Sequence, residues 1–510
     1  MSKTIPAAMR DAAKRFGEKV ALLPPDASPM SFAGLDALVD DVARALIAAG
    51  MAEGERVAVW APNSCEWIGA AIGIQRGGGV LVPLYERLKG REVAEILARA
   101  GASFVITSRP LADLLEGHEL PQLRRTVCLD ESWDDFLDAG RAVSADALAA
   151  REEAVTPDSI SDIMFTSGTT GRPKGGVFHQ SSSVAAARIM QHYNHAGPDD
   201  VFCPMGTFAH VGGYKQGWLT GTVSGCAICW GSALDPASVL KLIADVGITI
   251  IPAAPITWQG ILDHPDRGSF DISRLRFAAT GATTIPPGLV GRMIAELGLE
   301  QVGTGYGMTE TCGMDAYTRP EDPPEKVVST VGPAAPDTEV RIVDPHGNDL
   351  PTGETGEILV RSPRQLVEYL DDPEATAAAI TPDGWFHTGD LGSFDEDGYL
   401  TIADRLKDMY IINGLNVYPA EIERALGTIP GVAQCAVVGV PEDVKGEVGA
   451  AFIVRTPGAS LSETDVLAWA KDNLASYKVP KYVRFVDDLP RTAMGKVVKP
   501  DLAKMMERNA

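Results

Sequence analysis

The sequence has no long apolar run, few cysteines and little positive charge. No stretch approaches the roughly 18–20 apolar residues that a membrane-spanning helix requires, so no transmembrane segment is expected. The first residues, MSKTIPAAMRDAAKRFGEK, lack the apolar core of a secretory signal. The seven cysteines are scattered along the chain, which suits a reducing compartment. Together these absences predict a cytoplasmic protein.

The shortage of positive charge excludes one class of partner and indicates two domains. The formal net charge is −23 at pH 7, and a nucleic-acid-binding protein is expected to be basic, so no nucleic-acid partner is expected. Residues 404–510 contain 14 basic and 14 acidic residues, which leaves 31 basic and 54 acidic residues for residues 1–403. We expect regions of such different charge balance to be separate domains.

The usual spacing of zinc ligands is also missing. Cys226 and Cys229 form one CxxC pair, but no second pair follows at a zinc-like spacing. We therefore expect ordinary apolar packing at these two cysteines and no metal.

Short apolar segments alternate with amphipathic segments through the first four hundred residues. Residues 56–60, 79–83 and 103–107 are expected to be strands, and residues 65–75 and 92–100 are expected to be helices. This alternation predicts βαβ units and an α/β fold with a largely parallel sheet.

The pattern changes twice after that region. From about Val331, short strands separated by glycine turns predict a β-rich subdomain that closes the large domain. After Asp404 a small α+β pattern begins, with an expected helix at 419–426 and an expected strand at 432–440. We place the boundary between the domains near residues 403–408.

The most informative segment is IMFTSGTTGRPKG, residues 163–175. Glycines in such a loop allow a close approach of the backbone, and the lysine adds a positive charge, so the loop is suited to bind phosphate. It is not a Walker A loop, because Lys174 is followed by Gly175. The candidate phosphate ligands are Thr166, Ser167, Gly168, Thr169, Thr170, Gly171 and Lys174.

The string TSGTTGRPKG resembles the phosphate loop of the adenylate-forming (AMP-binding) superfamily, in its acyl-CoA synthetase branch. Further motifs follow in the family's order across nearly the whole chain. The resemblance implies a large N-terminal adenylation domain at 1–403, a hinge at 404–408 and a small mobile C-terminal domain at 409–510. It also implies ATP, Mg²⁺ and coenzyme A as cofactors, and a small-molecule carboxylic acid as substrate.

The resemblance assigns the nucleotide contacts to three further motifs. Tyr306 would stack on adenine, Thr309 would contact the α-phosphate, and Glu310 with Thr166 would hold Mg²⁺, which prefers carboxylate and other oxygen ligands. Asp390, in WFHTGDLG, would bind both ribose hydroxyls. The remaining members of the two adenine motifs are Gly281, Ala282, Thr283, Gly305, Gly307 and Met308.

The C-terminal motifs would serve both half-reactions. Arg405 would reach the ribose and phosphates, Lys407 would be the hinge, and Gly414 would line the pantetheine tunnel. Lys496, in LPRTAMGKVVKP, matches the catalytic lysine that bridges the substrate carboxylate and the α-phosphate. The acidic neighbours of these motifs are expected to have no special role: a charged turn at Asp404 and Asp408, and a solvated helix face at Glu421 and Glu423.

The acid-binding pocket is expected around the segment TFAHVGGYK. His210 matches an aromatic position that guards the carboxylate and the thiol tunnel, and the two following glycines are expected to leave room for a bulky substrate. The candidate pocket residues are His210, Val211, Gly212, Gly213, Tyr214, Trp230, Ala254, Pro255, Thr304 and Met314.

A finer resemblance concerns the acid itself. The strings ILDHPDRGSFDISRLRFAATGA and YLDDPEATAAAI look like those of the CoA ligases of bacterial steroid degradation, which act on an indanedione propanoate (HIP). The segments FAHVGG and GGYKQG depart from that group, which tends to carry aromatic residues there. Fatty acids and aryl-propenoic acids therefore stay open as substrates.

Two other classes of protein are alternatives. A stand-alone adenylating enzyme that loads a carrier protein would share all the nucleotide motifs. A silent binding protein would be expected to lose Lys174, Glu310, Asp390 or Lys496, and all four are present. The oligomeric state stays open, with a homodimer among the options.

Overall fold

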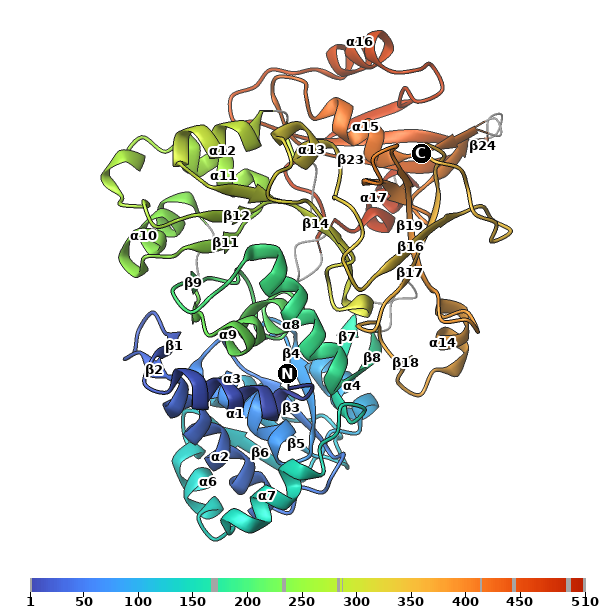
Figure 1. Ribbon diagram of the computed structural model, residues 1–510. Helices are drawn as coiled ribbons and strands as arrows, with labels where there is room; N and C mark the ends of the chain where they lie inside the picture. The colour runs from blue at the N-terminus through green and yellow to red at the C-terminus, as the bar shows by residue number, and fades with distance from the viewer. Residues whose placement is uncertain are drawn as a thin grey trace. The chain divides into compact units, whose positions relative to one another are not determined.

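The computed structural model describes residues 2–166, 173–231, 235–281, 285–286, 288–412, 415–442, 446–491 and 497–507. By its internal contacts the chain divides into two compact units. Figure 1 shows the helices and strands of each. The first unit is Met1–Glu339 with Arg361–Phe386, and the second is Val340–Val360 with His387–Ala510. The second unit thus begins before the expected hinge at 404–408, which stays a prediction.

The first unit contains two large sheets. One has the strand order β18-β8-β7-β4-β3-β5-β6; from β7 to β6 neighbouring strands are parallel, while β8 and β18 are antiparallel to their neighbours. The largely parallel sheet predicted from the sequence is confirmed. Its strands are β3 (Arg56–Trp60), β4 (Val80–Leu84), β5 (Phe104–Thr107), β6 (Arg125–Cys128), β7 (Ile160–Thr166), β8 (Lys174–His179) and β18 (Glu368–Tyr369).

Helices cover both faces of this sheet. Successive side chains of a strand point to opposite faces. In β3, Val57 and Val59 pack in one apolar cluster with helices α2 (Phe32–Ala48) and α3 (Cys65–Arg76). Ala58 and Trp60 pack in another cluster, with helix α4 (Gly90–Ala100). Burial on both sides explains why the strand is a continuous apolar run.

The second sheet of this unit has the order β13-β12-β11-β9-β10-β1-β2. Helices α10 (Pro236–Val246), α11 (Pro255–Leu262) and α12 (Leu289–Leu297) pack in one apolar cluster with this sheet. Helices α8 (Gln180–Asn194) and α9 (Leu219–Ser224) belong to the core shared by both sheets. The strands are β1 (Val20–Leu23), β2 (Met30–Ser31), β9 (Val201–Phe202), β10 (Ala227–Cys229), β11 (Ile250–Pro252), β12 (Phe277–Ala279) and β13 (Gln301–Gly303).

The shorter elements of the first unit complete it. Among the described residues, no helix is both long and apolar enough to span a membrane. Cys226 and Cys229 are buried in the apolar clusters. The remaining elements are α1 (Ile5–Phe16), α5 (Arg109–Ala112), α6 (Trp133–Gly140), α7 (Ala145–Glu153), α13 (Pro324–Ser329), α14 (Pro373–Ala379), the hairpin β14 (Gly305–Tyr306) with β15 (Ala316–Tyr317), and the short turns η1 (Asp113–Leu115), η2 (Tyr214–Trp218), η3 (Arg267–Ser269) and η4 (Thr309–Thr311).

The second unit is built on two further sheets. The first is β16-β17-β19-β20, and the second is β22-β21-β24-β23, with β25 beside β24. The first sheet confirms the β-rich pattern expected after Val331, but by its contacts it groups with the second unit, whereas it was expected to close the large domain. The predicted helix at 419–426 is α15. The elements are β16 (Glu339–Val343), β17 (Gly356–Arg361), β19 (Phe386–Phe394), β20 (Leu400–Arg405), β21 (Tyr410–Ile412), β22 (Leu415–Val417), β23 (Val432–Glu442), β24 (Gly446–Arg455), β25 (Tyr482–Phe485), α15 (Pro419–Leu426), α16 (Glu463–Asn473) and α17 (Lys499–Glu507).

Two acidic residues of the second unit differ from expectation. Asp404 is buried, not part of an exposed charged turn, and its carboxylate accepts the N–H groups of Arg405 and Ala420 at 2.7 Å each. It thereby satisfies a backbone donor in the first turn of α15, and burial raises its pKa. Glu423 was expected on a solvated face, but it accepts the N–H of Val437 at 2.7 Å and pairs with Lys499 at 2.8 Å.

Candidate active site

Thr166 and Glu310, the two expected metal ligands, lie together although 144 residues separate them. Thr166 is the last residue of β7, and Glu310 lies in the short turn η4. The Thr166 hydroxyl donates to Glu310 Oε1 at 3.3 Å. The backbone carbonyl of Glu310 accepts the N–H of Leu366 at 2.7 Å, which anchors the turn. A carboxylate and a hydroxyl at this distance provide the hard oxygen ligands that Mg²⁺ prefers.

Lys174 and Tyr369 complete this cluster. Lys174 begins β8, and its Nζ lies 5.0 Å from the centroid of the Tyr369 ring. The Tyr369 hydroxyl donates to Glu310 Oε1 at 3.3 Å. Tyr369 lies in the segment YLDDPEATAAAI and was not among the predicted site residues. The cluster thus combines an anionic carboxylate with an ammonium group, as binding of a metal–polyphosphate pair requires.

Several expected nucleotide ligands lie outside the described residues, and their roles stay predictions. Gly281, which is described, follows β12 at a φ of +152°, and a Cβ there would come within 2.9 Å of Thr304 Oγ1. The expected ligands outside the described ranges are Ser167, Gly168, Thr169, Thr170, Gly171, Ala282, Thr283, Gly414 and Lys496.

The expected adenine motif forms the strand β14 and the turn that follows it. Tyr306 is half-buried, and its carbonyl accepts the N–H of Asp315 at 2.7 Å. Gly307 lies so close to Gly313 that a Cβ on it would stand 2.0 Å from the Gly313 carbonyl oxygen. The half-buried Met308 and Thr309 lead into Glu310. The hairpin therefore holds Tyr306 and Glu310 on one rigid segment.

A fully buried carboxylate supports this segment. Asp315 accepts the Thr311 hydroxyl and lies 3.9 Å from the guanidinium of Arg364, which itself pairs with Asp337 at 3.0 Å. Burial raises the pKa of Asp315 to about 7, although Arg364 opposes the shift. A carboxyl group whose pKa is near neutral pH is therefore in contact with the segment that carries the expected adenine motif.

The expected ribose contacts lie side by side in the second unit. Asp390 on β19 and Arg405 on β20 are directly paired strand positions, and Arg405 Nε lies 3.4 Å from Asp390 Oδ1. Thr388 donates its hydroxyl to the carbonyl of Ile358 at 2.7 Å and accepts the N–H of Asp390 at 3.1 Å. Lys407, the expected hinge, is exposed in the turn after β20. An acceptor for a diol and a cation for phosphate are thus adjacent on one sheet.

The expected acid pocket is only partly assembled from the predicted residues. His210 is half-buried, and its Nδ1 accepts the N–H of Gly212 at 3.3 Å. A Cβ at Gly212 would meet only His210 Nδ1, at 3.7 Å, so this glycine leaves room. A Cβ at Gly213 would stand 2.0 Å from the Thr207 carbonyl oxygen. Gly213 therefore serves close packing and, contrary to expectation, adds no space for the acid.

Other expected pocket residues differ in their surroundings. Val211, Trp230, Pro255, Thr304 and Met314 are buried, and Ala254 is exposed at the start of α11. Tyr214 departs from the expected role of a pocket wall, because it is fully buried and its hydroxyl bonds Asp162 and Gln75.

Tyr214 belongs to a buried polar cluster that joins three motifs. Lys215 and Asp162 are both fully buried, with Nζ 3.0 Å from Asp162 Oδ1. Lys215 Nζ also lies 3.4 Å from the Sγ of Cys312 and 3.4 Å from the centroid of the Phe178 ring. Asp162 is on the strand that leads to Thr166, and Cys312 follows η4. The cluster thus connects the expected acid pocket to both metal-ligand segments.

The chain matches two families, described as "AMP-binding enzyme" over residues 9–370 and "AMP-binding enzyme C-terminal domain" over residues 421–496. It belongs to the AMP-binding enzyme family. Two relatives are named 3-[(3aS,4S,7aS)-7a-methyl-1,5-dioxo-octahydro-1H-inden-4-yl]propanoyl:CoA ligase. The one from Mycobacterium tuberculosis is 44% identical over 99% of both chains, and the one from Rhodococcus jostii is 43% identical over 97% of both.

A solved structure shows the same fold. ATP-bound MatB from Rhodopseudomonas palustris superimposes with a TM-score of 0.90, at 30% identity, over 99% of both chains. The α/β fold with a C-terminal domain, the family and its cofactors, ATP, Mg²⁺ and coenzyme A, are as predicted. The cluster of Thr166, Glu310 and Lys174 fits this set, since two oxygen donors and one ammonium suit a metal-bound polyphosphate.

Proposed function

We propose that this protein is an ATP-dependent acid–CoA ligase whose acid is the bicyclic indanedione propanoate of steroid breakdown. The observation that carries the proposal is the cluster of Thr166, Glu310 and Lys174, in which the paired strands β7 and β8 meet the distant turn η4. Identity of 44% over 99% of a ligase named for that acid supports the substrate. The open space at Gly212, next to His210, is compatible with a bulky acid.

The first half-reaction, formation of the acyl-adenylate, requires no general base. A carboxylate is ionised at neutral pH, so its oxygen attacks the α-phosphorus of ATP directly, and the bond from that phosphorus to pyrophosphate breaks. The protein contributes orientation and neutralisation of charge in the transition state. Thr166 and Glu310 would hold the magnesium ion, which supplies charge neutralisation at the phosphates, and Lys174 would bind the phosphates. Lys496 would bridge the carboxylate and the α-phosphate.

The second half transfers the acyl group to coenzyme A. The thiol sulfur attacks the acyl carbon, the carbon–oxygen bond to AMP breaks, and the thiol proton goes to solvent. We propose that rotation at Lys407 withdraws Lys496 and presents the Gly414 face for this step. Asp390 and Arg405, adjacent on their sheet, would keep hold of the ribose and phosphate.

The test is pyrophosphate release with MgATP and coenzyme A across a panel of acids, with the acyl-CoA product checked by mass spectrometry. We expect the indanedione propanoate to be preferred over C8–C16 fatty acids, coumarate and benzoate. Preference for a fatty or aryl-propenoic acid would refute the substrate. Pyrophosphate release without a thioester would indicate a carrier protein as the acyl acceptor and refute the proposed transfer to coenzyme A.

A pair of lysine variants tests the role given to Lys496. Lys496→Ala is expected to abolish acyl-adenylate formation, whereas Lys471→Ala, which removes an exposed lysine of helix α16, should leave it unchanged. A Lys496→Ala protein that still forms acyl-adenylate at the parent rate would contradict the mechanism.

The proposal extends to the compartment. All seven cysteines are free of disulfides; six of them are buried, and Cys435 is half-buried. Free thiols of this kind suit a reducing interior, so we place the enzyme in the cytoplasm.

A further inference from the structure

Tyr369 contacts both charged groups of the candidate site. Its hydroxyl donates to Glu310 Oε1 at 3.3 Å, and its ring centroid lies 5.0 Å from Lys174 Nζ. The side chain is 8% exposed, so it is packed in place. We infer that Tyr369 is a positioning residue, which orients Glu310 for the metal ion and Lys174 for the phosphates. This inference rests on the proposed function.

The backbone around Tyr369 is tied to the same two segments. Strand β18 pairs with β8 at Tyr369↔Gly176, and the N–H of Leu370 donates to the carbonyl of Gly175 at 2.7 Å. On the other side, the N–H of Leu366 donates to the carbonyl of Glu310 at 2.7 Å. Five residues of chain therefore connect the start of β8, where Lys174 lies, with the turn that carries Glu310.

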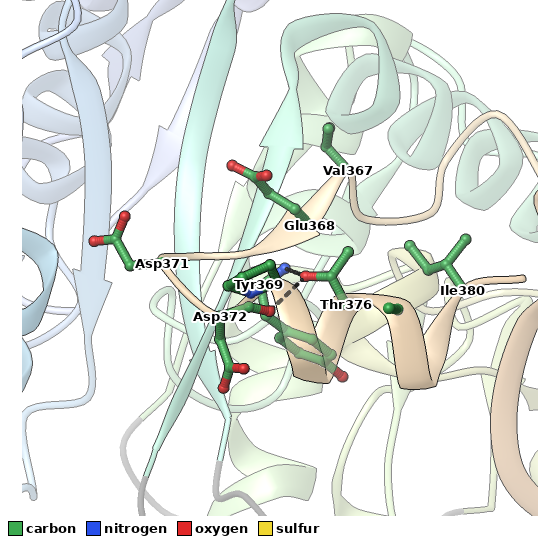
Figure 2. Close-up of a pocket in the computed structure, with 9 residues that line it drawn as sticks. Val367, Glu368, Tyr369, Asp371, Asp372, Thr376 and Ile380 are labelled. Carbon is green, nitrogen blue, oxygen red and sulfur yellow. Dashed lines mark hydrogen bonds between the residues drawn. The ribbon is translucent and has the colours of Figure 1, made fainter. Parts of the chain in front are cut away.

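The segment is also fixed from its outer side. The N–H of Tyr369 donates to Thr376 Oγ1 at 2.9 Å, a bond that Figure 2 shows. Asp372 caps helix α14 by accepting the N–H of Ala375 at 2.9 Å. Here β18 and α14 line a shallow pocket of about 380 Å³, bordered by Val367, Glu368, Tyr369, Asp371, Asp372, Pro373, Thr376, Ala377 and Ile380. None of the residues expected to bind the acid borders it.

The chemistry of the phenol suits this role. The phenol group of a tyrosine ordinarily has a pKa near 10, so the Tyr369 hydroxyl is a neutral donor to Glu310 at working pH. Thr166 and Tyr369 both donate to Glu310 Oε1, so the other oxygen, Oε2, would be the one to bind the cation. The face of an aromatic ring attracts an ammonium group and restricts where it can lie. Ligands oriented before binding need no reorganisation when the charge arrives.

The hydroxyl and the ring can be tested separately. Tyr369→Phe keeps the ring and removes the donor, so we expect the affinity for Mn²⁺, measured by electron paramagnetic resonance with a non-hydrolysable ATP analogue, to fall about tenfold. The Mg²⁺ concentration for half-maximal pyrophosphate release should rise by the same factor, with the KM for the acid unchanged. Tyr369→Leu also removes the ring and should in addition raise the KM for ATP.

Two controls separate positioning from general packing. Tyr193→Phe removes another buried phenol hydroxyl of the same unit, for which no hydrogen bond is seen in the described part of the chain, and should leave Mn²⁺ affinity unchanged. On a Glu310→Gln background, Tyr369→Phe should cause no further loss, because the hydroxyl acts through that carboxylate. Unchanged Mn²⁺ affinity in Tyr369→Phe, or an equal further loss on that background, would overturn the inference.

The readout also separates this inference from the proposed function. Mn²⁺ and nucleotide bind without an acid or coenzyme A, so the positioning test keeps its meaning even if the acid panel refutes the proposed substrate.

Discussion

The buried pair of Lys215 and Asp162 makes a strong prediction about stability. Both side chains are fully buried, and the charged atoms lie 3.0 Å apart. At an effective dielectric constant of about 20, Coulomb's law gives an attraction of about 5 kcal/mol, which offsets the cost of removing both charges from water. Lys215→Met keeps a similar volume but leaves the carboxylate buried without its cation. We expect it to lower the free energy of unfolding by about 3–5 kcal/mol.

The double variant Asp162→Asn/Lys215→Met should be less destabilised than Lys215→Met alone. The amide oxygen of an asparagine can still accept the hydroxyls of Ser161, Ser183 and Tyr214, which Asp162 Oδ2 accepts in the parent. No uncompensated charge then remains in the interior. The cycle of single and double variants therefore isolates the charge from the change of shape.

Urea unfolding followed by tryptophan fluorescence measures the effect. Trp218 stacks on Tyr214 with ring centroids 4.7 Å apart, so its emission reports on this part of the core. Lys241→Met is the matched control, since Lys241 pairs with Asp245 on the exposed face of α10 and should contribute no measurable stability. A loss below about 1 kcal/mol in Lys215→Met, or a double variant no better than this single variant, would refute the reasoning.

Two further predictions concern the candidate site. Because burial raises the pKa of Asp315 to about 7, its contribution to stability is complete below the unfolded pKa near 4 and is lost as the pH rises through 7. Asp315→Asn cannot ionise, so its thermal stability relative to the parent should increase as the pH rises from about 4 to about 7; no increase would contradict the shift. Gly213→Ala would clash with the Thr207 carbonyl, so it should lower the free energy of unfolding by about 1–3 kcal/mol and lower the unfolding temperature. Gly212→Ala should fold normally and change only the preference among acids. Equal unfolding temperatures of the two glycine variants would contradict this.

Local sequence patterns were sufficient to predict the helices and strands named in the sequence analysis. The apolar run of β3 and the helical pattern at residues 65–75 are set by neighbours in sequence, and the structure places β3 and α3 where the pattern predicts. The nucleotide motifs were found because each is a continuous string. Glu310 and Thr166 were paired through the family resemblance, and the structure brings them within 3.3 Å.

Residues that act through distant strand pairing were not predictable in this way. Tyr369 reaches Glu310 only because the two-residue strand β18 adds to the edge of β8, nearly 200 residues earlier in the chain. A strand that short has no periodicity to detect. The buried role of Lys215 was not predictable either, because a lysine after a glycine-rich turn is usually exposed. Its partner, Asp162, comes from another segment, strand β7, which packs against η2. In both cases the partner of a buried polar side chain is a charged group on a distant segment. The contacts that connect the motifs with one another are therefore the part of the site that required the structure.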